Sequence, residues 1–122
     1  MAACIMGSHN NTYADDHFDI QAGKKIYTQC TGCHTYSYHR TGPKHCGLFG
    51  QRAGSANGFE FTQAMKESGI IWTTATLDKF LKSPLEMIPG TSMGFSGIAS
   101  RTERSQLISF LASLSNSNPL CR

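Results

Sequence analysis

Long apolar runs are missing from this chain of 122 residues. No run of about 18 apolar residues occurs, so we expect no membrane-spanning helix. Residues 1–17 are polar and contain neither the basic segment nor the apolar segment of a secretory signal peptide. We therefore expect them to form a flexible N-terminal arm ahead of the folded domain.

Strand patterns are poor and internal repeats are absent, which argues against a β-rich or solenoid fold. Apolar spacing and helix-end residues instead predict four helices, over 18–30, 62–67, 74–82 and 102–114. The predicted fold class is all-α: one domain over 18–115 with long loops, followed by a tail over 116–122. Hydrophobic residues make up only 39%, which is low for a self-sufficient core, so we expect this small domain to need a further stabilising link.

A second C-x-x-C is also missing, which argues against a zinc finger or zinc ribbon, and no βαβ pattern supports a thioredoxin-like dithiol. What the chain has is Cys30-Thr31-Gly32-Cys33-His34, a run typical of c-type haem attachment. Two cysteine sulfurs at this spacing can add to the two vinyl groups of one porphyrin, and the adjacent imidazole can bind its iron. We predict one covalent haem c on Cys30 and Cys33, with His34 as an axial ligand.

A second ligand is predicted 59 residues further on, in Pro89-Gly90-Thr91-Ser92-Met93-Gly94-Phe95. The thioether of Met93 lies on a turn-rich segment, and His/Met ligation is an electron-carrier arrangement that raises the haem potential. A buried core methionine is the more common fate of this residue type. The competitors are the other methionines: Met1, Met6, Met65 and Met87.

Together with these motifs, the rest of the chain resembles class I cytochromes c, the mitochondrial and bacterial c2-like group, from about residue 19 to 115. The matching segments occur in the family's order: Ala22-Gly23-Lys24-Lys25-Ile26-Tyr27, Thr41-Gly42-Pro43, Gly47-Leu48-Phe49-Gly50, Ser68-Gly69-Ile70-Ile71-Trp72, Thr76-Leu77-Asp78-Lys79-Phe80-Leu81 and Arg101-Thr102-Glu103-Arg104. The resemblance implies that the first and last helices cross, with Gly23 and Tyr27 against Leu107 and Phe110.

The resemblance also implies a role for each residue of a haem pocket. The loop at Pro43 would accept the second imidazole N–H of His34. Trp72 would donate its indole N–H to a haem propionate, and Thr91 would hydrogen-bond nearby. The remaining contacts would come from apolar walls: Leu48, Leu77, Phe80, Leu81, Phe95 and Ile98.

Several positions depart from the family pattern: His45, Gln51, Phe61, Met65 and Phe80. Phe61 and Phe80 lack a tyrosine hydroxyl near the propionate and the methionine. Gln51 replaces a common arginine, and Arg52 is a candidate substitute. Met65 stands in place of an asparagine, and His45 in place of an apolar pocket residue. These departures concern the propionate environment and leave the predicted ligands intact.

Three cysteines lie outside the haem motif: Cys4, Cys46 and Cys121. Haem attachment of this type usually occurs where disulfides persist, and we expect the periplasm, with the mitochondrial intermembrane space as the alternative. The resemblance places Cys46 near the end of the last helix, so a Cys46–Cys121 disulfide is predicted. Pairing through Cys4 and three free thiols remain the alternatives.

The formal net charge is +3, without a basic run or an aromatic-interleaved basic patch, so no nucleic-acid partner is expected. The resemblance implies a one-electron carrier and not an enzyme. It also implies a monomer whose partners are redox proteins such as a bc1-type complex, a terminal oxidase or a dehydrogenase. Two alternatives stay open: a cytochrome subunit of a larger respiratory or dehydrogenase complex, and a haem peroxidase or gas sensor. The last would need an open iron position and distal polar groups.

Overall fold

The computed structural model describes residues 12–122, with side chains from residue 19 onward. Its helices are α1 (Thr12–Ile26), α2 (Gln63–Lys66), α3 (Thr74–Lys82), α4 (Pro84–Met87) and α5 (Arg101–Ser113), with 3-10 turns η1 (Tyr27–Cys30) and η2 (Pro119–Cys121). In this part of the chain the only β pairing is one isolated bridge, between Arg52 and Ile71. The all-α prediction is confirmed.

Helices α3 and α5 each begin directly after a residue whose side-chain hydroxyl caps the helix. The Thr73 hydroxyl accepts the Thr76 backbone N–H, and the Thr76 hydroxyl accepts the Thr73 N–H in return. This capping box begins α3 at the predicted residue. The Ser100 hydroxyl accepts the Glu103 N–H and begins α5.

Some predicted boundaries are wrong. The first helix begins at Thr12 and not at Phe18, so the predicted arm over 1–17 overlaps α1, while residues 1–11 lie outside the described part. Its last four predicted residues form the tighter η1 turn. Helix α4 was not predicted: Pro84 ends α3 but also begins a new turn, because proline suits the first helical position.

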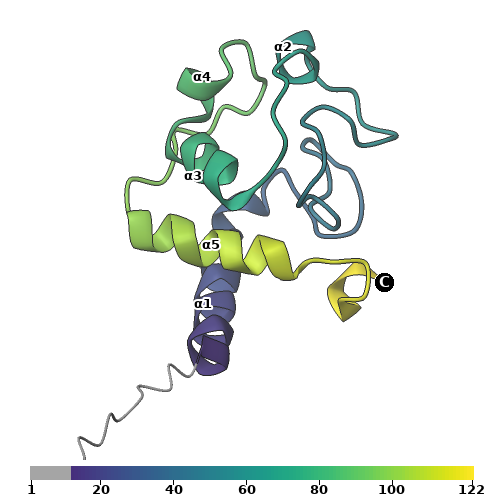
Figure 1. Cartoon of the computed structure of the whole chain (residues 1–122). Coiled ribbons are helices and arrows are strands. Elements are labelled where there is room, and N and C mark those ends of the chain that lie inside the picture. The colour runs from purple at the N-terminus through teal and green to yellow at the C-terminus, as the bar shows by residue number, and fades with distance from the viewer. Residues whose placement is uncertain (1–11) are drawn as a thin grey trace, which may run out of the picture.

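Helices α1 and α5 cross closely, with α3 on the other side of α5 (Figure 1). Gly23 permits the approach, since a Cβ at this residue would meet the Gln106 carbonyl oxygen and lie 2.8 Å from Phe110 Cβ. Tyr27, Leu107 and Phe110 are buried beside it. The predicted glycine-against-aromatic crossing is confirmed.

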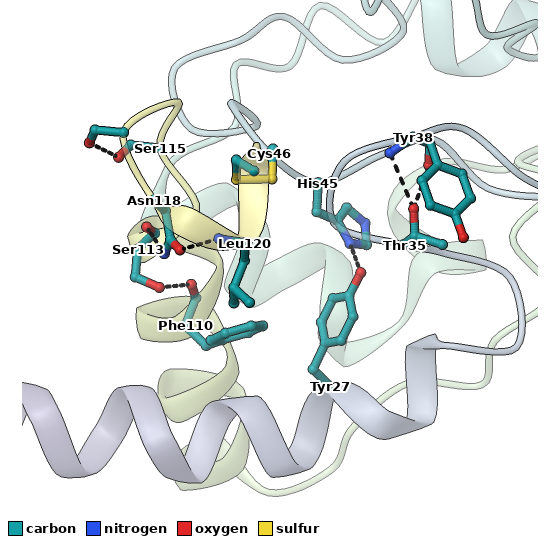
Figure 2. The surroundings of a disulfide bond; sticks show 12 residues. Tyr27, Thr35, Tyr38, His45, Cys46, Phe110, Ser113, Ser115, Asn118 and Leu120 are labelled. Atoms are coloured by element: carbon teal, nitrogen blue, oxygen red, sulfur yellow. Dashed lines mark hydrogen bonds between the residues drawn. A yellow bond between two sulfur atoms is a disulfide. The ribbon is translucent and has the colours of Figure 1, made fainter.

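A disulfide joins Cys46, in the loop after the C-x-x-C-H run, to Cys121 in η2, with the two Cα atoms 5.8 Å apart (Figure 2). The Gly47 N–H also donates to the Leu114 carbonyl at 2.8 Å. The predicted pairing is confirmed, and Cys4 lies outside the described residues. The tail expected over 116–122 therefore folds back onto the domain.

Candidate haem site

A cavity of about 600 Å³ opens between the C-x-x-C-H loop, the segment after α4 and the inner faces of α3 and α5. Its size is within the range of cofactor and ligand pockets. It brings together all of the residues predicted for the site except Ile98: Cys30, Cys33, His34, Pro43, Leu48, Trp72, Leu77, Phe80, Leu81, Thr91, Met93 and Phe95.

The C-x-x-C-H residues are presented by the turn that ends η1. The backbone N–H groups of Cys33 and His34 both donate to the Cys30 carbonyl, at 3.2 and 2.9 Å. This compact turn directs both thiols and the imidazole to one cavity. Neither Cys30 nor Cys33 is in a disulfide. Burial, with a smaller effect of Cys33, raises the pKa of Cys30 to about 11, so Cys30 is a neutral thiol.

His34 is oriented by the loop that follows it. Its Nδ1 donates to the Pro43 carbonyl at 2.7 Å, since a carbonyl can only accept. This fixes the tautomer and leaves the Nε2 lone pair available for a metal. Gly42 lies directly over the ring, where a Cβ would come within 2.7 Å of Nε2. Burial lowers the pKa of His34, against the opposing effect of the Pro43 hydrogen bond, and so favours the neutral ligand form.

His45 packs against His34 with ring centroids 4.2 Å apart and planes inclined by 26°. A hydrogen bond of 2.8 Å joins its Nδ1 to the hydroxyl of Tyr27. Burial, and to a smaller extent the neighbouring His34, lowers the pKa of His45 to about 3. The imidazole is therefore neutral at physiological pH.

Met93 lies on a segment that hydrogen bonds hold in place on both sides. The Thr91 N–H donates to the Ile88 carbonyl at 3.0 Å, and the Thr91 hydroxyl accepts the Met93 N–H at 3.3 Å. Further on, the Ile98 N–H donates to the Leu81 carbonyl at 2.8 Å, next to Gly97 at φ 108°. The thioether is thus held at the cavity by backbone contacts on both sides.

Trp72 supplies a polar group that fits a haem carboxylate. The side chain is only 6% exposed and packs against Phe80 at 5.0 Å. Its indole N–H makes none of the hydrogen bonds found among the described residues, although buried tryptophans normally have a partner. A largely apolar cavity with two thiols, a neutral imidazole, a thioether and this donor matches the requirements of a covalent haem.

The structure also corrects and extends the predicted lining. Ile98 is buried in the core but does not line the cavity. Met65, considered only as a competing ligand and a family departure, does line it, whereas Met87 lies at a separate small pocket. Phe59 and Leu111 contribute without having been predicted, although Leu111 lies one helical turn after Leu107 on the same face of α5.

Comparison with known proteins agrees with this geometry. The cytochrome c family model matches residues 20–115. Cytochrome c2 of Rhodomicrobium vannielii is 39% identical over 97 residues, covering 77% of this chain and 78% of the relative. Cytochrome c 2.1 of Caenorhabditis elegans is 38% identical over 96 residues, covering 76% and 86%. The solved structure of cytochrome cH from Methylobacterium extorquens superposes with a TM-score of 0.76 at 35% identity, covering 78% and 98%.

Proposed function

This chain belongs to the cytochrome c family, and we propose that the residues gathered in its cavity perform the family's one-electron transfer. The family carries one covalently bound haem c, whose iron supplies the reversible Fe(III)/Fe(II) couple. The main support for assigning these residues is that the C-x-x-C-H run and Met93 line the same cavity.

Cys30 and Cys33 attach the porphyrin in this assignment. Their two thiols would hold the porphyrin through thioether bonds to its two vinyl groups, an addition of S–H across each double bond that needs no oxidant. Covalent attachment at two points, with burial by the apolar wall, limits movement of the cofactor between its redox states. The Trp72 indole N–H would donate to a propionate and stabilise its negative charge.

The His34 imidazole and the Met93 thioether would hold the iron. The Pro43 carbonyl holds the His34 proton at Nδ1, which directs Nε2 to the metal. With Met93 as the second ligand, no coordination position would stay open for a substrate. This closed arrangement supports an electron carrier over a peroxidase or gas sensor.

Location and partners are inferred from the cysteines and the relatives. The Cys46–Cys121 disulfide supports an oxidising compartment. The bacterial c2 and cH relatives favour the periplasm, and the mitochondrial-type relatives support the intermembrane space as the alternative. Redox proteins such as a bc1-type complex, a terminal oxidase or a dehydrogenase are the proposed partners. No described helix is long and apolar enough to cross a membrane.

Replacing Met93 tests the closed coordination. Met93→Ala removes the thioether and opens one iron position, so the ferrous protein should bind carbon monoxide at neutral pH and the midpoint potential should fall. The matched control is Met65→Ala, because Met65 is the other methionine of the described lining. Carbon monoxide binding is followed by the absorption spectrum of the reduced haem protein.

The control should retain the wild-type spectrum and bind no carbon monoxide. Carbon monoxide binding by Met65→Ala but not by Met93→Ala would reverse the ligand assignment. Binding by the unaltered protein would favour the gas-sensing or peroxidase alternative.

A further inference from the structure

His45 contacts the proposed iron ligand, although neither haem attachment nor iron ligation uses it. Its ring lies nearly parallel to that of His34, at a centroid separation of 4.2 Å. The resemblance to class I cytochromes c assigns an apolar residue to this position. A flat, polar ring in its place therefore requires a separate explanation.

Tyr27 determines how the His45 ring lies. Its hydroxyl is 2.8 Å from His45 Nδ1, and Figure 2 shows the phenol extending toward the imidazole from the start of η1, directly after α1. Tyr27 is 1% exposed and is fixed by aromatic contacts with Phe110 at 5.4 Å and Tyr36 at 5.1 Å. The crossing of α1 and α5 thus fixes the phenol, and the phenol fixes His45.

His34 needs such a support because its hydrogen bond to Pro43 constrains only part of its orientation. The bond at Nδ1 and the backbone at Gly42 limit rotation of the ring about its Cβ–Cγ bond, and a second packed ring would narrow that rotation further. A parallel ring on one face resists that rotation, because aromatic rings favour particular stacking geometries. An aliphatic side chain would fill the same volume without a preferred plane.

We propose that His45, held by Tyr27, is a positioning residue that fixes the plane of the His34 imidazole. This inference rests on the proposed ligation of the iron by His34. In a low-spin Fe(III) haem, the plane of an axial imidazole selects the iron orbital that carries the unpaired electron. It therefore determines how unpaired spin is distributed over the porphyrin. The helix crossing would in this way influence the electronic structure of the electron-transfer centre.

The test uses the haem-loaded protein and its variants His45→Leu, His45→Phe and Tyr27→Phe. Tyr36→Phe is the matched control, since it deletes a neighbouring hydroxyl that has no hydrogen bond among those described. Proton NMR of the oxidised form measures the haem methyl shifts, which report spin distribution. Thermal unfolding separately measures stability.

His45→Leu should change the order or spread of the methyl shifts, and Tyr27→Phe should change them in the same direction by less. His45→Phe keeps a flat ring and should resemble wild type more than His45→Leu does. Tyr36→Phe should leave the pattern unchanged.

Unchanged shifts in both His45→Leu and Tyr27→Phe, with wild-type low-spin His/Met spectra, would overturn the positioning role alone. If His45→Leu does not fold, Tyr27→Phe decides the test, because unchanged methyl shifts in that variant would overturn the positioning role. A wild-type protein without low-spin His/Met haem would instead overturn the proposed function.

Discussion

Arg104 links three parts of the structure through one buried guanidinium. Its Nε donates to Asp78 Oδ1 at 2.8 Å, which joins α5 to α3. Its Nη1 donates to the carbonyls of Ile98 and Ala99, both at 2.9 Å. These carbonyls lie on the segment that follows Met93, so Arg104 also anchors the proposed ligand loop.

Arg104→Met should be much more costly than Asp78→Asn. The methionine keeps an apolar stem but leaves the buried Ile98 carbonyl without its donor, while exposed Ala99 can turn to water. We expect a loss of about 3 kcal/mol in the free energy of unfolding, given ~1–3 kcal/mol for each unsatisfied buried group and the lost charge-assisted bonds. The Asp78 side chain is 40% exposed, so Asp78→Asn should cost about 1 kcal/mol or less.

Two optical signals of the oxidised haem protein separate anchoring from general stability. Far-ultraviolet circular dichroism follows the helices, and the weak long-wavelength band of methionine-ligated haem follows the proposed Met93–iron bond. In Arg104→Met the band should be lost at lower denaturant concentration than the helix signal. In Asp78→Asn both transitions should shift together and only slightly.

Arg104→Lys serves as the charge-conserving control, because one ammonium group cannot reproduce the planar fork of donors. It should lie between wild type and Arg104→Met. Equal destabilisation by Asp78→Asn and Arg104→Met would show that the ion pair, and not the carbonyl anchoring, supplies the energy.

Two further predictions concern the covalent and steric constraints of the fold. A Cys46→Ala, Cys121→Ala variant should lose about 4 kcal/mol in denaturant unfolding, because the disulfide closes a loop of sequence separation 75 in the unfolded chain; an unchanged midpoint would contradict that account. Gly23→Ala should cost about 1–3 kcal/mol by pushing against the Gln106 backbone. Gly32→Ala, where a Cβ has open space, is its control, and equal losses would show that steric contact at the crossing is not the cause.

Local chemistry made much of this molecule predictable. The C-x-x-C-H run specified its cofactor because the reacting groups are adjacent in sequence. Pro84 marked the end of α3, since proline sterics act on the residue before it, and the predicted start at Thr74 coincides with the capping box of Thr73.

Features that depend on tertiary packing were harder to predict. Helix α1 extends to Thr12 through a polar stretch without apolar periodicity, so no pattern marked its start. Met65 was recognised as a methionine near a helix, but only the fold shows that it lines the cavity. Residues alone left the pairing of Cys46 open, because a disulfide needs two distant backbones at a specific separation.

The Cys46–Cys121 disulfide also has a consequence for the order of biosynthesis. In an unfolded chain, the closely spaced Cys30 and Cys33 meet more readily than partners 75 residues apart, because the entropy cost of loop closure grows with loop length. Early oxidation would therefore join Cys30 and Cys33 in a disulfide and block the thiols that haem attachment requires. We expect maturation to begin with a reduced C-x-x-C pair and thioether formation. The Cys46–Cys121 disulfide should form last, once folding has brought η2 beside the loop that contains Cys46.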